Sequence, residues 1–107
     1  MASDAVVEVT TLDALHEILN KYSRVVVDFH APAWCVPCRR LAPHIDVAAK
    51  KNENVRFVKV DVDRADQSIR DTFPIMSVPT VLYFEDGNQT KEIVGRTAIQ
   101  ILQELDS

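Results

Sequence analysis

The sequence lacks most of the features that would assign it to a specialised class of protein. Its 107 residues include only two glycines and two cysteines. No apolar run approaches the roughly 20 residues that a membrane span requires, no segment is rich enough in glycine, serine or proline to form a linker, and no internal repeat is present. We therefore expect residues 1–107 to form one globular domain without a membrane-spanning segment.

The charge of the chain also excludes some partners. A net charge of -4 gives no reason to expect nucleic acid or an anionic membrane surface as a partner. The opening residues, MASDAVVEVT, lack the basic patch and apolar core of a secretory signal. We therefore expect a cytoplasmic protein, and structural disulfides are rare in that compartment.

Strand and helix signals alternate along the chain. The expected strands occupy residues 5–9, 24–29 and 54–63, and two more form a hairpin within 80–95. The expected helices occupy residues 12–22, 41–48, 65–73 and the segment after 97. This βαβαβαββα order predicts an α/β fold with a central mixed sheet, parallel in its crossovers, and with helices on both faces.

Three local signals support these boundaries. Thr10 and Asp13 are placed to cap the first helix, and Thr97 with Gln100 forms a capping box for the last one. The Asp-Gly dipeptide at 86–87 is typical of a tight hairpin turn.

Both cysteines lie in the segment HAPAWCVPCRR, residues 30–40. A loop that Cys35 and Cys38 close over two residues removes little entropy from the unfolded chain, so a purely structural disulfide is a weak hypothesis. A zinc site needs four ligands, but there is no second CxxC motif, and the spacing of His44 from the cysteines is poor. We interpret His16, His30 and His44 as surface or rim residues.

The third hypothesis for the cysteine pair is thiol–disulfide exchange. Cys35 follows a buried strand at the start of a helix, and such a position lowers the pKa of a thiol from its usual value of about 8.5. Arg39 and Arg40 act in the same direction if their charges approach the sulfur. Cys38 lies on the same helix face, so Cys35 can attack a partner's disulfide and Cys38 can then release the mixed disulfide.

Asp28 is an acidic residue in the otherwise apolar segment RVVVDF. It either lies at the strand end and faces water, or it is buried with a raised pKa and accepts the proton of Cys38. Lys59, on a candidate neighbouring strand, is placed to moderate that pKa shift.

Several motifs together resemble the thioredoxin family. They are VVVDF with Asp28, WCVPC, Pro43 in the following helix, FVKVDVD with Lys59, SVPT with Pro79, and the glycines at 87 and 95. The resemblance extends from the first strand to the last helix. It implies a thioredoxin-like fold, with Cys35 as nucleophile, Cys38 as resolving cysteine and Asp28 as a buried proton acceptor linked to Lys59.

The resemblance further implies that Pro79 follows a cis peptide bond and faces the disulfide. The backbone of Val78 would then pair with an extended substrate segment. An apolar rim for docking would comprise Trp34, Val36, Pro37, Val78, Pro79, Val94 and Gly95. For Val78 and Val94, ordinary core packing is the alternative.

The implied activity is that of a protein-disulfide oxidoreductase that passes reducing equivalents to protein disulfides. By the resemblance it binds no cofactor of its own, acts as a monomer, and is recharged by a thioredoxin reductase that uses flavin and NADPH. The alternative is a binding module of the same fold with incidental redox activity. Two departures from the family pattern are the additional Ala33, and Val36 in place of the usual glycine.

Overall fold

The computed structural model describes residues 5–106, which form five strands and four helices in the predicted order. The strands are β1 (Val6–Glu8), β2 (Arg24–His30), β3 (Arg56–Asp61), β4 (Thr80–Glu85) and β5 (Asn88–Ile93). The helices are α1 (Leu12–Lys21), α2 (Val36–Lys51), α3 (Gln67–Thr72) and α4 (Ala98–Leu105). No helix in this described part of the chain is long and apolar enough to cross a membrane.

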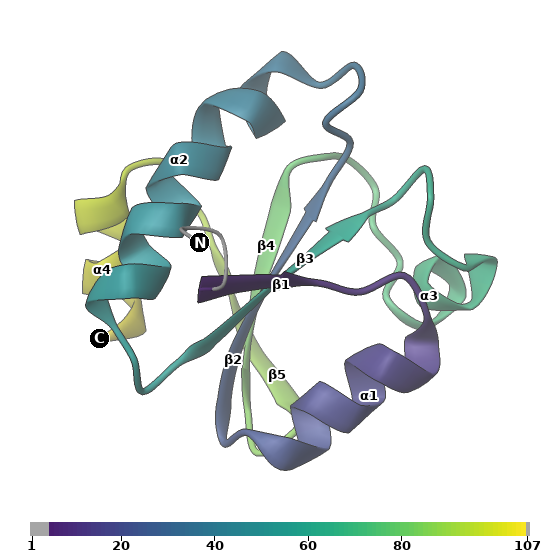
Figure 1. Cartoon of the computed structure of the whole chain (residues 1–107), viewed down its shortest axis with the longest axis horizontal. Coiled ribbons are helices and arrows are strands. Elements are labelled where there is room, and N and C mark those ends of the chain that lie inside the picture. The colour runs from purple at the N-terminus through teal and green to yellow at the C-terminus, as the bar shows by residue number, and fades with distance from the viewer. Residues whose placement is uncertain (1–4, 107) are drawn as a thin grey trace.

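One sheet in the order β1-β3-β2-β4-β5 forms the centre of the molecule (Figure 1). β3 runs parallel to both β1 and β2, whereas β4 runs antiparallel to β2 and β5. The predicted mixed sheet, with parallel crossovers and a closing hairpin, is therefore confirmed. Because the carboxyl ends of the parallel strands share one edge, the loops after β2 and β3 meet there.

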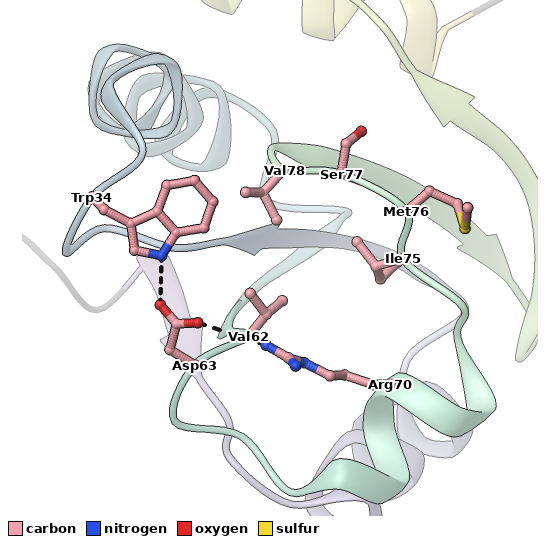
Figure 2. Close-up of a pocket in the computed structure, with 8 residues that line it drawn as sticks. All are labelled: Trp34, Val62, Asp63, Arg70, Ile75, Met76, Ser77 and Val78. Atoms are coloured by element: carbon pink, nitrogen blue, oxygen red, sulfur yellow. Dashed lines mark hydrogen bonds and ion pairs between the residues drawn. The ribbon is translucent and has the colours of Figure 1, made fainter.

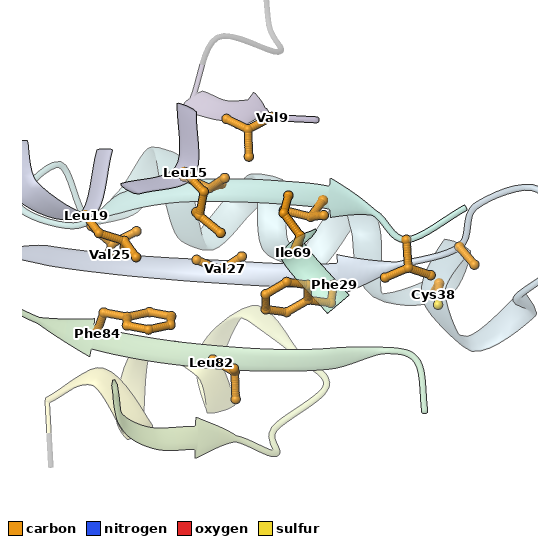
Figure 3. Packing of buried hydrophobic residues seen from close by; sticks show 14 of the residues in the cluster. Val9, Leu15, Leu19, Val25, Val27, Phe29, Cys38, Ile69, Leu82 and Phe84 are labelled. Carbon is orange, nitrogen blue, oxygen red and sulfur yellow. The ribbon is translucent and has the colours of Figure 1, made fainter. Parts of the chain in front are cut away.

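The run of β-branched residues in β2 forms a strand that is buried on both faces. Val25, Val27 and Phe29 pack in one apolar cluster with Leu15 of α1 and Ile69 of α3 (Figure 3). Val26 instead belongs to a second cluster, which contains residues of α2 and α4. The alternation of side chains along β2 therefore determines which pair of helices covers each face.

The cap of α1 lies one residue later than predicted. Thr11, not Thr10, is the N-cap, and its hydroxyl oxygen accepts the Ala14 N–H at 3.1 Å. The Thr10 carbonyl instead accepts the Asp66 N–H at 2.9 Å. Two adjacent threonines offer the same capping chemistry, so the sequence alone does not distinguish them.

The cap of α4 matches its prediction in part. The Thr97 hydroxyl oxygen accepts the Gln100 N–H at 3.2 Å, as expected of an N-cap. The Gln100 side chain, however, accepts the Arg96 N–H at 2.9 Å and not that of Thr97. The Gln100 side chain therefore fixes the backbone just before the N-cap of the helix.

The hairpin turn between β4 and β5 is confirmed. Asp86 and Gly87 have φ angles of 52° and 84°, so both occupy the left-handed region that the favoured two-residue turn requires. β3 is shorter than predicted and begins at Arg56, whereas Ala65 and Phe73 lie outside α3 but still pack against the core.

Candidate active site

The cysteine pair lies where β2 leads into α2. Cys35 and Cys38 form a disulfide with their Cα atoms 5.2 Å apart. Cys35 is the N-cap of α2, and its Sγ accepts the Cys38 N–H at 3.2 Å. The same N–H and the positive end of the helix would stabilise a thiolate at Cys35.

A tight turn before the disulfide accommodates the additional alanine. The Trp34 and Cys35 N–H groups both donate to the Ala31 carbonyl, at 3.2 and 2.9 Å. Ala33 is exposed within this turn. Because both bonds return to Ala31, the turn holds Cys35 at the helix start despite the extra residue.

The Val78–Pro79 peptide bond is cis, as the resemblance implied. The Val78 carbonyl oxygen lies 3.8 Å from the Sγ of Cys35, so this segment faces the disulfide directly. Cys35 and Cys38 are only 4% and 1% exposed in the disulfide form. A partner therefore has to reach the sulfur of Cys35 through the surface around it.

Asp28 is buried, with only 3% of its surface exposed, so the alternative that it faces water is excluded. Its register partner in β3 is Lys59, and its Oδ1 has no hydrogen-bond partner within residues 5–106. Burial raises the pKa of Asp28 from 3.8 to about 7, while the charges of Arg96 and, to a smaller extent, Lys59 oppose the rise. Arg96 was not predicted, since it follows β5 and only the fold brings it close.

The interpretation of His30 as a surface or rim residue is wrong. β2 continues one residue beyond the predicted end, and His30 pairs with Asp61 of β3 inside the covered sheet. Its Nε2 has no hydrogen-bond partner among the described residues. Burial lowers the pKa of His30, although the nearby carboxylate of Asp61 opposes the change.

The other two histidines differ from each other. His16 is exposed, as expected, and makes an edge contact with the ring of Phe73. His44 is half-buried and its Nδ1 accepts the Ala98 N–H at 3.3 Å. Within residues 5–106, no three metal-binding side chains are grouped as a metal site would require.

Most of the expected rim residues expose apolar surface. Trp34 and Val94 are 62% and 66% exposed, and Val36 is also exposed. Pro37 is exposed, whereas Val78 and Pro79 are half-buried. Their exposure is consistent with docking, which stays a prediction for each of them.

Gly95 differs from the expected rim because it is buried. Its N–H donates to Oε2 of Glu104 at 2.6 Å, and a Cβ at this position would lie 2.6 Å from the Cβ of Gln100. Gly95 still lines a surface pocket together with Val94, so its contribution to docking stays a prediction. The absence of a side chain at this position instead permits the close approach of α4.

A polar group that was not predicted holds the indole of Trp34. The Trp34 Nε1–H donates to Oδ2 of Asp63 at 2.8 Å, and Oδ1 of Asp63 lies 3.6 Å from a guanidinium nitrogen of Arg70. These three residues and Met76 line a pocket of about 240 Å³ beside Val78 (Figure 2). Asp63 ends the FVKVDVD motif, but no pattern in the sequence pointed to Arg70 or Met76.

Known proteins share this architecture over nearly the whole chain. The thioredoxin family model matches residues 6–107. A thioredoxin of Echinococcus granulosus is 39% identical over 89% of this chain and 87% of its own length. A thioredoxin of Mycoplasmoides gallisepticum is 38% identical over 91% of this chain and 95% of its own.

The solved structures agree with the sequence relatives. The oxidised form of mitochondrial thioredoxin 3 from Saccharomyces cerevisiae matches with a TM-score of 0.85 and 25% identity, covering 99% of this chain and 98% of that one. Because sequence, fold and the bonded Cys-x-x-Cys pair all lead to the same relatives, the chain belongs to the thioredoxin family of protein-disulfide oxidoreductases.

Proposed function

We propose that Cys35 is the attacking cysteine and Cys38 the resolving cysteine in the reduction of protein disulfides. The observation that supports these roles is the position of Cys35 as the N-cap of α2, where its sulfur accepts the Cys38 N–H. A thiolate at that position gains both the hydrogen bond and the helix dipole. The sulfur of Cys38 lies one turn further into the helix and is buried.

The exchange takes two steps. The thiolate of Cys35 attacks one sulfur of the client disulfide, so a mixed disulfide forms and the first client sulfur leaves as a thiolate. Cys38 then loses its proton and attacks the sulfur of Cys35, which releases the second client thiolate. Two electrons have passed to the client, and the Cys35–Cys38 disulfide is the oxidised product.

Asp28 is the proton acceptor that we propose for Cys38. A carboxyl group with a pKa of about 7 exchanges protons readily near neutral pH. Lys59 and Arg96 keep this buried group from titrating higher still.

Docking precedes the chemistry in this proposal. An extended client segment would pair with the backbone of Val78, whose carbonyl faces the sulfur of Cys35, while the cis bond at Pro79 presents that backbone. The apolar side chains of Trp34, Val36 and Pro37 would cover the client on one side of the disulfide. The exposed Val94 would extend this apolar surface.

The remaining proposals concern the setting in which the protein acts. We propose a cytoplasmic protein that works as a monomer and a single domain, without a cofactor of its own. A thioredoxin reductase that uses flavin and NADPH would return the disulfide to the dithiol. The family supports disulfide substrates and a reductase partner in general terms.

Reduction of insulin with dithiothreitol as electron source tests this function. We expect turbidity from the released insulin chains to appear much sooner with the protein than with dithiothreitol alone. The C35S and C38S variants serve as controls that remove the exchange chemistry. Turbidity no faster than with dithiothreitol alone would instead favour a binding module with incidental redox activity.

A further inference from the structure

The pocket beside the disulfide has apolar walls and one cationic side chain. Val62, Ile75 and Val78 provide apolar lining, and Met76, which is 93% exposed, also lines the pocket. Figure 2 shows the Arg70 side chain extending from α3 toward Asp63 across this pocket. An occupant therefore meets apolar surface and a guanidinium together.

The guanidinium of Arg70 has unused hydrogen-bonding capacity. Its contact with Asp63 is 3.6 Å, longer than a hydrogen bond, and its side chain donates no hydrogen bond to any residue between 5 and 106. The other oxygen of Asp63 is already engaged by Trp34. Since a guanidinium has five N–H donors, Arg70 can bind a second carboxylate without losing Asp63.

The charges around the disulfide favour an acidic partner. Arg39 and Arg40 are exposed in the first turn of α2, directly after the cysteine pair. Asp28 and Asp61 are buried, so their carboxylates do not face a docked client. Asp63 does line the pocket, but its two oxygens already face Trp34 and Arg70. The exposed carboxylates on α3 and at its N-cap, those of Asp71 and Asp66, do not line the pocket.

We infer that this pocket binds a glutamate side chain of the client, within about two residues of the cysteine that Cys35 attacks. The inference rests on the proposed docking of an extended client segment against Val78. Val78 both lines the pocket and contacts Cys35 Sγ, and two residues of extended chain span about 7 Å. The methylene groups of the glutamate pack against Ile75 and Met76, and its carboxylate pairs with Arg70.

Disulfide-bridged peptides that differ at a single position test the inference. Glutamate, glutamine or lysine is placed two residues before or two residues after the attacked cysteine, and kcat/KM for reduction is measured for each peptide. In one of the two series, before or after the cysteine, we expect the glutamate peptide to be reduced up to about fivefold faster than the glutamine peptide, the upper end for an exposed ion pair. The lysine peptide should be the poorest, and 0.5 M salt should reduce the preference.

Three variants assign the preference to Arg70. R70Q should lower the glutamate-to-glutamine ratio to about one. D63N should raise it, because the competing carboxylate is removed while an amide oxygen remains to accept from Trp34. The matched control is R64Q, which removes the same charge from an exposed neighbour outside the pocket and should change the ratio less than twofold.

The outcomes separate the inference from the proposed function. Equal reduction of glutamate and glutamine peptides by the wild type, or a preference that persists in R70Q, would overturn the glutamate pocket and leave the reductase function intact. Failure to reduce any of the peptides or insulin would overturn both.

Discussion

The carboxyl group of Asp28 is buried in the central strand of the sheet, where an ionised group is costly. Lys59 and Arg96 offset part of that cost, but burial dominates and the pKa remains near 7. A purely structural role would be served better by an apolar residue. The presence of a carboxyl group here is consistent with a role in proton transfer.

We expect D28N to stabilise the protein in a pH-dependent manner. The unfolded carboxyl group loses its proton near pH 3.8 and the folded one near pH 7, so the folded state binds more protons between these values and its stability falls as the pH rises. At about 1.36 kcal/mol per pKa unit, the loss above pH 7 amounts to about 4 kcal/mol. Urea unfolding should therefore show a small difference between variant and wild type at pH 4 and a gain of a few kcal/mol for D28N at pH 8. A gain that is the same at both pH values would contradict the raised pKa.

The same substitution should slow the second chemical step. General base catalysis typically contributes about 10²–10⁴-fold, and we expect D28N to slow release of the mixed disulfide at least about tenfold at pH 7. The deficit should shrink as the pH rises, because Cys38 then ionises without help. Rapid-mixing kinetics with a single disulfide peptide measures this step, and an unchanged release rate between pH 6 and 8 would remove Asp28 from the mechanism.

Helix α2 begins at Val36, which is exposed next to the attacking cysteine. V36G removes apolar surface that only a docked client would cover, whereas greater loop freedom affects both redox forms. When two unlike protein disulfides are compared, we expect V36G to change the ratio of their kcat/KM values severalfold. The reduction potential, measured by equilibration with glutathione, should shift by less than about 30 mV.

The control for V36G is V47G, which removes an equally exposed valine from the same helix, away from the disulfide. V47G should lower helix stability but leave the choice between the two clients unchanged. A potential shift above about 30 mV in V36G with unaltered client kinetics would show that Val36 adjusts the disulfide and not the docking surface.

The connection between β5 and α4 depends on the missing side chain at Gly95. G95A would place a Cβ 2.6 Å from the Cβ of Gln100 and 2.7 Å from Oε2 of Glu104, so α4 has to move. We expect the free energy of unfolding to fall by about 1–3 kcal/mol, as for other overpacked sites. The exposed Gln103 on the same helix provides the control Q103A, and equal stability of the two variants in urea would contradict this account.

Local patterns predicted the elements well because their signals are local. The valine run of β2, the Asp-Gly turn and the Thr97 cap each depend on a few adjacent residues. Local patterns do not fix where an element ends: β2 extends to His30, and that one residue changes a predicted surface histidine into a buried one. An element's end depends on how far its neighbour continues to pair with it, which no local pattern contains.

At the scale of the whole molecule, the strand order β1-β3-β2-β4-β5 determines which distant residues meet. It confirms the predicted proximity of Asp28 and Lys59, which are opposite each other in β2 and β3. The approach of Arg96 to Asp28 and the contact of Asp63 with Trp34 join segments that are distant in the sequence. These contacts could not be predicted, since nothing in the local sequence indicates them.

Trapping the mixed disulfide tests the central claim most directly, namely that this fold presents Cys35 to a client disulfide and keeps Cys38 to resolve it. The reduced C38S variant is mixed with a disulfide-bridged peptide, and intact-mass spectrometry followed by peptide mapping locates any adduct. We predict a stable peptide adduct on Cys35 in C38S and a markedly slower or absent adduct in C35S. Rapid adduct formation on Cys38 in C35S, together with an unreactive Cys35 in C38S, would contradict the account.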